Sequence, residues 1–294
     1  MQYGIPYMGS KNTIAEDIVN AIPPGGKILD ACCGGGAFLM AAAMSMRWSA
    51  VVGNDINLAT IKLLDAVLIN KGQIEYEHPA ACSRVDFFNS IQRIKNGDFD
   101  IQDCVNKYCA SFGNDGKSYI YGESIEEYKL IAEKMLTAET LSERRSYYRK
   151  FFDIVTNNND DDGRLQKLEF VQRLQSLERL ERLERLDLFD VDYSEFDIVY
   201  FDPPYKGTHE YDFKFDYERF YDLFSSLKIP AFLSEYDAPF ECVAEFEKPQ
   251  MMAASVGSTK STTKEKLYFN GSKDRYKQLM GRFYKEKEVQ LSLF

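Results

Sequence analysis

The chain has 294 residues, of which 45% are hydrophobic and 28% are charged, and its net charge at pH 7 is −10. These values predict a soluble globular protein with a large core. No apolar stretch approaches the roughly 18–20 residues that span a bilayer, and the first residues lack a basic-then-apolar leader. Six scattered cysteines form no CxxC pair and there are only two histidines, so we expect a cytoplasmic protein with no metal and no membrane partner.

The acidic balance disfavours a nucleic-acid partner, because neutralising phosphates requires Lys and Arg. The charge is unevenly distributed, however: from Lys260 to Lys287 there are nine Lys or Arg residues against three acids, and residues 144–150 interleave cations with tyrosines. Each region alone could be an ordinary solvated face. Together they predict a localised polyanion-binding surface. Its candidate residues are Arg144, Arg145, Arg149, Lys150, Lys260 and Lys264.

The first 70 residues predict a β-α-β-α unit that follows a short N-terminal helix. The expected elements are a helix over 13–22, a strand over 27–33, a glycine turn at 34–36, a helix over 39–47, a strand over 50–54 and a helix over 58–70. The glycines would let a ligand lie against bare backbone N–H groups at a helix start. Asp55 follows the second strand, about 20 residues after the glycines, where an acid can accept ribose hydroxyls.

This unit predicts a nucleoside-type cofactor and leaves two choices open. NAD enzymes prefer the pattern G-x-G-x-x-G, but Phe38 occupies the last glycine position here. Asp30 would repel a pyrophosphate, yet it could accept a hydrogen bond from an ammonium group. These residues favour S-adenosylmethionine over NAD.

Residues 71 to about 190 break the α/β pattern and predict a large insertion that recognises the substrate. Its expected elements are a polar turn over 111–117, a short strand over 118–121, helices over 125–137 and 141–155, and a polar linker over 157–163. A Leu-x-x repeat follows from Leu174 to Leu186. Its Leu, Glu and Arg content predicts a helical connector, although a three-residue period drifts around a helix of 3.6 residues per turn.

A second apolar run, Ile198–Phe201, predicts a buried strand that ends at Asp202, because Pro203 and Pro204 cannot continue a sheet ladder. Ligands of open α/β sheets bind outside the carboxyl ends of the strands. An acid, a proline carbonyl and the Tyr205 ring at that edge would suit a flat polar base. The remaining expected elements are a helix over 216–227 and strands over 231–234, 242–246 and 266–269, with a phosphate-contacting loop over 255–264.

Four segments in this order resemble the Dam-type family of DNA adenine methyltransferases in its alpha arrangement: YMGSK at 7–11, DACCGGGAF at 30–38, GNDIN at 53–57 and DPPY at 202–205. SFGNDGKSYIYG, the Leu-x-x repeat and FDPPYKGT look especially like phage and prophage members. The resemblance implies a Rossmann-like S-adenosylmethionine-dependent methyltransferase sheet with an inserted, mostly helical target-recognition domain. The implied division is a cofactor part at 1–88, the inserted region at 89–189 and the DPPY part at 190–294.

The resemblance also assigns roles to residues. The cofactor would lie against Tyr7, Lys11, Asp30, Gly34, Gly35, Gly36, Asp55, and Asp192 or Tyr193. The target base would be held by Asp202, Pro203, Pro204 and Tyr205. Where the family usually has Phe-x-Gly-x-Gly, this chain has Cys32-Cys33-Gly34-Gly35-Gly36, so an aromatic cofactor contact is missing.

The expected function is transfer of a methyl group from S-adenosylmethionine to the exocyclic amine of adenine in double-stranded DNA, after the base is flipped into the DPPY pocket. The main alternatives are methylation of the cytosine 4-amino group and a catalytically inactive DNA-binding protein on the same scaffold. Methylation of a protein glutamine and NAD-dependent chemistry fit the residues less well. We expect a monomer or weak dimer in a bacterial or phage-infected cell. These residues predict neither the DNA sequence that is recognised nor whether a restriction enzyme accompanies the protein.

Overall fold

The computed structural model describes residues 3–69, 82–122, 131, 134–135, 138–158, 179–205, 215–249 and 262–281. The chain forms two compact units. Unit 1 comprises Met1–Gly4, Lys11–Ile61 and Leu177–Phe294, and unit 2 comprises Ile5–Ser10 and Lys62–Ser176. The division expected from the resemblance, at 1–88, 89–189 and 190–294, stays a prediction.

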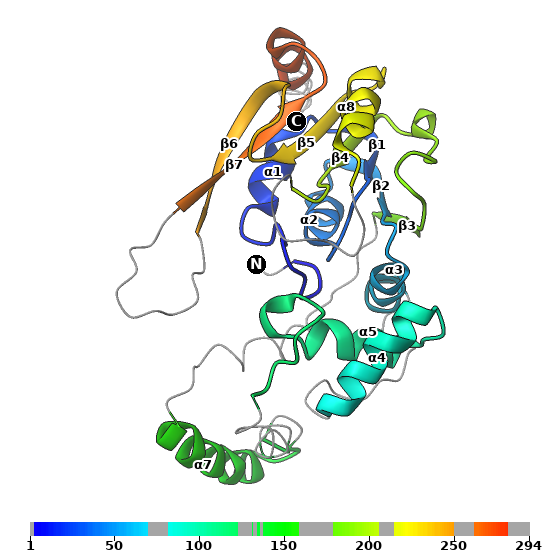
Figure 1. Cartoon of the computed structure of the whole chain (residues 1–294). Helices are drawn as coiled ribbons and strands as arrows, with labels where there is room; N and C mark the ends of the chain where they lie inside the picture. Colours follow the sequence, from blue (N-terminus) through cyan, green and yellow to red (C-terminus); the bar gives the residue numbers. More distant parts are fainter. Residues whose placement is uncertain are drawn as a thin grey trace. The chain divides into compact units, whose positions relative to one another are not determined.

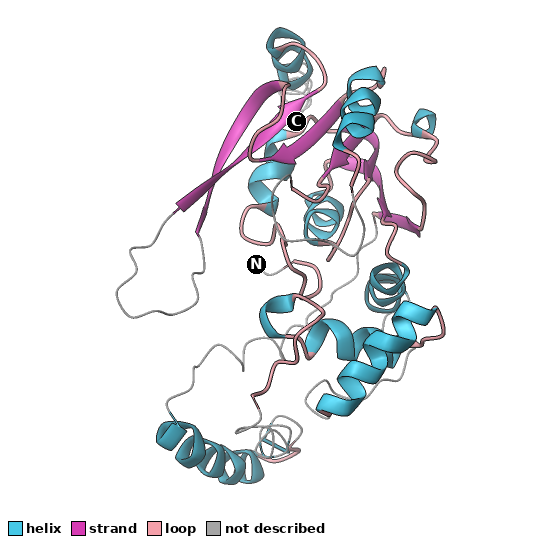
Figure 2. Cartoon of the chain, in the orientation of Figure 1, coloured by secondary structure: helices cyan, strands magenta, loops and turns pink. Residues whose placement is uncertain are grey.

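Unit 1 is built on a seven-stranded sheet within the described residues (Figures 1 and 2). Its order is β3 (Leu180–Glu184), β2 (Trp48–Asn54), β1 (Gly25–Asp30), β4 (Ile198–Phe201), β5 (Ala231–Glu235), β7 (Thr262–Phe269) and β6 (Glu241–Pro249). The first five pair in parallel, whereas β7 is antiparallel to both of its neighbours. The direction of strand order reverses between β1 and β4, and ligands of open α/β sheets bind at such a switch point. The expected Rossmann-like fold is confirmed.

Four helices of unit 1 lie close to where the sequence predicts them, namely α1 (Ala15–Ala21), α2 (Ala37–Ser45), α3 (Leu58–Leu64, which passes into unit 2) and α8 (Tyr217–Ser226). The short 3₁₀ turn η7 (Tyr193–Glu195) and a helix over 273–281 were not predicted. The helix expected over 58–70 changes to a π-helix, η1, at Asp65–Ile69.

Strand β4 shows how the sheet is covered on both faces. All four of its side chains are buried, as expected of a central parallel strand. Phe201 packs against Phe220 and Phe224 of α8 on one face. On the other face, the Tyr200 ring lies 4.0 Å from the ring of Phe38 of α2, centroid to centroid. The core therefore forms one layer on each face of the sheet.

The predicted helical connector is wrong for residues 180–184, which form β3 and pair in parallel with β2. Leu183 packs so closely on Gly53 that a Cβ at Gly53 would lie 2.7 Å from a Leu183 methyl carbon. Arg182 bonds Glu184 at 2.6 Å and Glu195 at 2.9 Å instead of forming helical i,i+4 pairs. Pairing with the β2 edge outweighs the helix propensity of Leu, Glu and Arg, which is a weak preference. The repeat before residue 179 lies outside the described residues.

Unit 2 contains two helices that the sequence reading did not anticipate, α4 (Arg84–Asn96) and α5 (Ile101–Cys109), together with η3 (Phe112–Asn114) and α7 (Leu141–Asn158). The helix expected over 141–155 is confirmed, and the one over 125–137 lies mostly outside the described residues. The strand expected over 118–121 is an isolated bridge between Ser111 and Tyr119. The linker expected over 157–163 overlaps the end of α7 at 157–158, and its remainder is outside the described residues.

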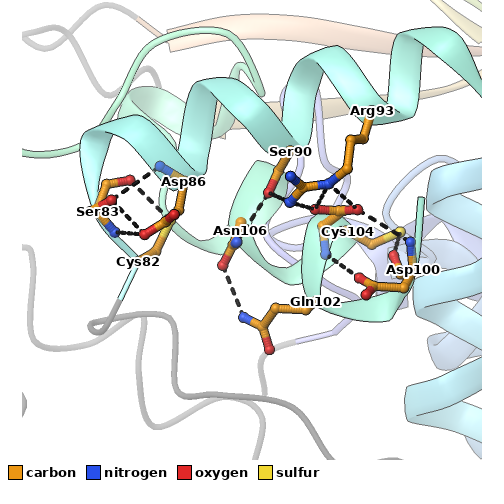
Figure 3. Close-up of polar contacts among 10 residues, drawn as sticks. Cys82, Ser83, Asp86, Ser90, Arg93, Asp100, Gln102, Cys104 and Asn106 are labelled. Carbon is orange, nitrogen blue, oxygen red and sulfur yellow. Dashed lines mark hydrogen bonds and ion pairs between the residues drawn. The ribbon is translucent and has the colours of Figure 1, made fainter. Parts of the chain in front are cut away.

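Polar contacts join α4 to α5 (Figure 3). Both helices begin with capping boxes, Ser83 with Asp86 and Asp100 with Asp103. The Arg93 Nε donates to both oxygens of the buried Asp103 carboxylate at 3.0 Å, and the Asn106 amide donates to Ser90 Oγ at 3.1 Å. These contacts make the helix pair a defined scaffold.

No helix in the part of the chain that the structure describes is long and apolar enough to cross a membrane. Within the same residues, no group of three or more His, Cys, Asp or Glu side chains is arranged to hold a metal ion.

Candidate active site

The glycine turn after β1 has the backbone geometry that its sequence demands. Gly34 and Gly36 adopt positive φ angles of 46° and 74°, which side chains rarely tolerate. Gly4 packs onto this turn, and a Cβ at Gly4 would lie only 2.2 Å from the Gly35 carbonyl oxygen. The turn is therefore enclosed by backbone.

Asp55, at the end of β2, ties the glycine turn to the next loop. Its Oδ2 accepts from the Gly34 N–H at 2.9 Å and its Oδ1 accepts from the Asn57 N–H at 2.8 Å. Burial raises the pKa of this carboxyl despite those two hydrogen bonds. Because each carboxylate oxygen can accept a second hydrogen bond, Asp55 can hold hydroxyl groups of a ligand while it keeps the turn in place.

Asp30 is the residue whose environment most clearly calls for a ligand. It is 1% exposed, and neither carboxylate oxygen has a hydrogen-bond partner among the described residues. Burial raises its pKa well above the ordinary value, and the negative charges of Asp202 and Asp55 raise it further. Lys11 and the nearby Leu39 amide act in the opposite direction without overcoming this effect. An ammonium group beside Asp30 would relieve the cost of this buried acid.

The ammonium group of Lys11 contacts two acids, Asp202 and Glu265. The ammonium, on a residue that is 4% exposed, lies 2.6 Å from Asp202 Oδ1 and 3.3 Å from Glu265 Oε1. Burial lowers the pKa of Lys11, but the two carboxylates outweigh burial and raise it above its ordinary range. Lys11 is therefore a permanent cation, and it fixes the carboxylate of Asp202 at the end of β4.

Tyr205 completes the group of side chains around Lys11. The Lys11 ammonium lies 4.6 Å from the centroid of the Tyr205 ring, and the Tyr205 hydroxyl donates to Glu265 Oε1 at 2.6 Å. Tyr236 meets the ring edge-to-face, with 4.8 Å between centroids. The Tyr217 hydroxyl donates to the Pro204 carbonyl at 2.7 Å, so α8 holds the proline turn in place.

The structure brings most of the predicted site residues together, since Lys11, Asp30 and Asp202 influence one another electrostatically and Asp55 acts on Asp30. Tyr7 belongs to unit 2, where its ring lies 5.8 Å from that of Tyr108. Its predicted cofactor contact stays a prediction.

The predicted cofactor contact of Asp192 or Tyr193 stays a prediction; the Tyr193 ring lies 5.8 Å from that of Phe201 of β4, centroid to centroid. The exposed Asp192 caps a 3₁₀ turn through Ser194, and the Tyr193 hydroxyl donates to the Leu188 carbonyl at 2.5 Å from a mostly buried ring. Arg144, Arg145, Arg149 and Lys150 are exposed on α7 of unit 2. Lys264 is exposed and pairs with Glu245 at 3.2 Å. Lys260 is outside the described residues.

Two residues that contact the DPPY segment, Glu265 and Tyr217, were not predicted from the sequence. Glu265 is in phase with Leu267 and Phe269, which are buried on β7, so an acid stands where the alternation calls for an apolar side chain. That mismatch was the available signal, but the predicted strand began one residue later, at Lys266. Tyr217 follows the helix-capping Asp216, and nothing in its local sequence indicates a contact with the proline turn.

No curated protein matches the sequence. Among solved structures, the chain is similar to the rRNA methyltransferase aviRa from Streptomyces viridochromogenes, with 15% identity, a TM-score of 0.33, and coverage of 87% of this chain and 82% of that one. Residues 7–270 match the family described as D12 class N6 adenine-specific DNA methyltransferase. This match spans the glycine turn, Asp55 and the DPPY motif, and the chain therefore belongs to the D12 class of N6 adenine-specific DNA methyltransferases.

Proposed function

We propose that this adenine-specific DNA methyltransferase performs its reaction at the edge of the sheet where β1, β2 and β4 end, with S-adenosylmethionine as methyl donor and double-stranded DNA as substrate. The observation that carries the proposal is the buried carboxyl group of Asp30 at that edge. The residue is 1% exposed, and neither of its carboxylate oxygens has a hydrogen-bond partner among the described residues. A ligand with a cationic group beside Asp30 would offset the cost of burying this acid.

The residues of the first half fit S-adenosylmethionine. Asp30 would accept from its ammonium group, the backbone of Gly34 to Gly36 would contact it closely, and Asp55 would accept from the ribose hydroxyls. When bound, this cofactor supplies a methyl group activated by the positive charge of a sulfonium. The chain's own contribution is to hold the donor in one orientation and to exclude water from it.

The residues of the second half would hold the target adenine. The amine that is methylated lies inside the duplex, so the nucleotide has to be flipped out, which costs a few kcal/mol. Contact with the Tyr205 ring offsets part of that cost, since stacking on an aromatic ring contributes about 1–3 kcal/mol per base. Asp202 and the Pro203 carbonyl would accept the two amine hydrogens and thereby direct the nitrogen lone pair toward the methyl group.

The exposed cations of α7 are proposed as contacts to DNA phosphates. Their spacing over one helical segment, with Lys150 5.7 Å from the ring centroid of Tyr147, suits a polyanion. Replacing Arg144, Arg145 and Arg149 with Ala should weaken DNA binding and reduce its salt dependence by up to about three counterions. Cytoplasmic localisation, a phage-related origin and a monomeric or weakly dimeric state stay predictions.

The test of this function is transfer of a labelled methyl group to duplex DNA, followed by digestion to nucleosides. We expect 6-methyladenine from the wild-type protein and no transfer by Asp202→Ala, which should still bind S-adenosylmethionine. The control is Glu195→Ala, which also removes an acid. The Glu195 side chain is 52% exposed and pairs with Arg182, so we expect this variant to transfer methyl groups as the wild type does. Label in 4-methylcytosine would support the cytosine alternative. DNA binding without transfer by the wild-type protein would support the inactive-scaffold alternative.

A further inference from the structure

Glu265 is a buried acid that the fold itself does not require. It is fully buried on β7, in phase with Leu267 and Phe269, and it lies opposite Phe246 in the β6–β7 register. An apolar side chain would serve the sheet better, because burying a carboxylate is costly unless it is paired and hydrogen-bonded. The position of Glu265 therefore calls for an explanation outside the packing of the strands.

Two contacts of Glu265 Oε1 are with residues of the proposed active site. The Tyr205 hydroxyl donates to it at 2.6 Å, a length typical of a hydroxyl donating to a carboxylate. The Lys11 ammonium lies 3.3 Å from the same oxygen. The partners come from separate parts of unit 1, one before α1 and one after β4, so Glu265 connects them on a third element.

The two distances from Lys11 are unequal in a way that bears on catalysis. Lys11 lies 2.6 Å from Asp202 and 3.3 Å from Glu265. When Asp202 accepts a hydrogen bond from a substrate amine, its hold on Lys11 weakens. If Asp202 were the counterion on which Lys11 depended alone, this weakening would leave a buried ammonium uncompensated, which is costly. Glu265 provides a second carboxylate, so the charge of Lys11 stays compensated.

We propose that Glu265 is a positioning residue for methyl transfer. It supplies the second counterion that keeps Lys11 in place while Asp202 engages the target amine. It also fixes the Tyr205 ring by accepting a hydrogen bond from the ring's hydroxyl. Tyr236 packs edge-to-face against the same ring. Glu265 touches neither base nor donor in this role. The inference rests on the proposed assignment of Asp202 and Tyr205 to the target base.

The principal test is Glu265→Gln, which keeps the shape and an oxygen acceptor for Tyr205 but removes the charge facing Lys11. We expect the single-turnover rate of DNA methylation to fall between about 10- and 100-fold, as for small misplacements of reacting groups. Affinity for S-adenosylmethionine and KM for DNA should stay within about threefold of wild type. A loss of kcat at nearly constant binding is expected of a residue that positions other groups for the reaction, because the interactions that are weakened are those made in the transition state.

The matched control is Glu245→Gln on the neighbouring strand β6. It makes the same change of charge at an exposed acid that pairs with Lys264, and Lys264 points to the opposite face of β7 from Glu265. We expect Glu245→Gln to methylate DNA at the wild-type rate. Tyr205→Phe removes the hydroxyl and provides a second test if Glu265→Gln does not fold. Combined with Glu265→Gln, it should show less than multiplicative loss, because Glu265→Gln weakens the hydrogen bond from the Tyr205 hydroxyl by removing the charge, and Tyr205→Phe removes the same bond.

The outcomes separate this inference from the proposed function. Wild-type protein that transfers no methyl group to DNA would refute the proposed function. With active wild-type protein, a Glu265→Gln rate within about threefold of wild type would overturn the positioning role alone. A lower rate with an equal loss of cofactor affinity or thermal stability would assign Glu265 a purely structural role. If only Tyr205→Phe can be measured, a rate within about threefold of wild type would equally overturn the inference.

Discussion

Replacing Lys11 with Met tests the electrostatic design of the site without using substrate. The residue is 4% exposed, and its ammonium is within 3.3 Å of carboxylate oxygens on Asp202 and Glu265. Methionine fills similar volume but leaves both acids without this cation. The protein should fold and should be less stable at neutral pH.

The size of the effect follows from burial. Removing one partner of a buried ion pair costs about 3–5 kcal/mol. The side chain of Asp202 is 19% exposed, so water partly replaces the ammonium, and the lower end, about 3 kcal/mol, is the better expectation. At about 2–4 °C per kcal/mol for a domain of this size, the Tm should fall by about 6–12 °C.

The pH dependence has a definite sign. The pKa of Lys11 is raised in the folded state, because the two carboxylates outweigh burial. A raised pKa contributes stability that is fully present below the unfolded-state value of about 10.4 and is lost as the pH rises above it. The wild-type advantage is therefore complete at pH 7.

The assay is thermal unfolding of the wild type and the variant between about pH 5 and pH 9, with Lys27→Met as the control. Lys27 is 22% exposed and pairs with Glu181 at 2.9 Å on the surface, so its loss should cost about 0–1 kcal/mol. Equal Tm values for the two variants at pH 7 would refute the reasoning.

Three further predictions concern neighbouring groups. Asp30→Asn should gain stability over wild type as the pH rises, because the raised pKa of Asp30 means that the wild-type protein loses stability when this buried carboxyl group ionises. Its affinity for S-adenosylmethionine, measured by calorimetry, should fall, and an unchanged affinity would disprove the ammonium contact. Gly4→Ala should weaken cofactor binding, since its Cβ would lie 2.2 Å from the Gly35 carbonyl oxygen at a φ of +73°, a conformation that costs about 1–2 kcal/mol; unaltered binding would show that the turn can yield. Tyr217→Phe should lose about 1 kcal/mol in denaturant unfolding along with its bond to the Pro204 carbonyl, and methylation should slow; full activity would release the proline turn from any role.

The parts of the fold that could be predicted depend on local patterns. The run Ile198–Phe201 is apolar and is followed by prolines, so both the position of this strand and its end before Pro203 could be predicted. The glycine turn begins four residues after the end of β1 and Asp55 follows β2 directly, so both could be placed at the carboxyl ends of these strands. These features are specified by residues within a few positions of one another.

The parts that were missed depend on distant partners. Lys11 and Asp202 are separated by 191 positions, and Tyr205 and Glu265 by 60, so no local pattern reports their contacts. β3 is a strand because the β2 edge accepts it, against the helix propensity of its own residues. For α4 and α5, by contrast, the capping boxes at Ser83 and Asp100 are local sequence patterns that predict where a helix begins.

The most direct measurement is a crystal structure of the protein with a duplex carrying its target adenine and a cofactor analogue that cannot donate a methyl group. We expect the adenine to be flipped out, with its amine about 2.7–3.2 Å from an Asp202 oxygen, and the analogue's ammonium beside Asp30. A target base held away from Asp202, or an analogue bound outside the Gly34 turn, would contradict the assignment of this edge as the active site.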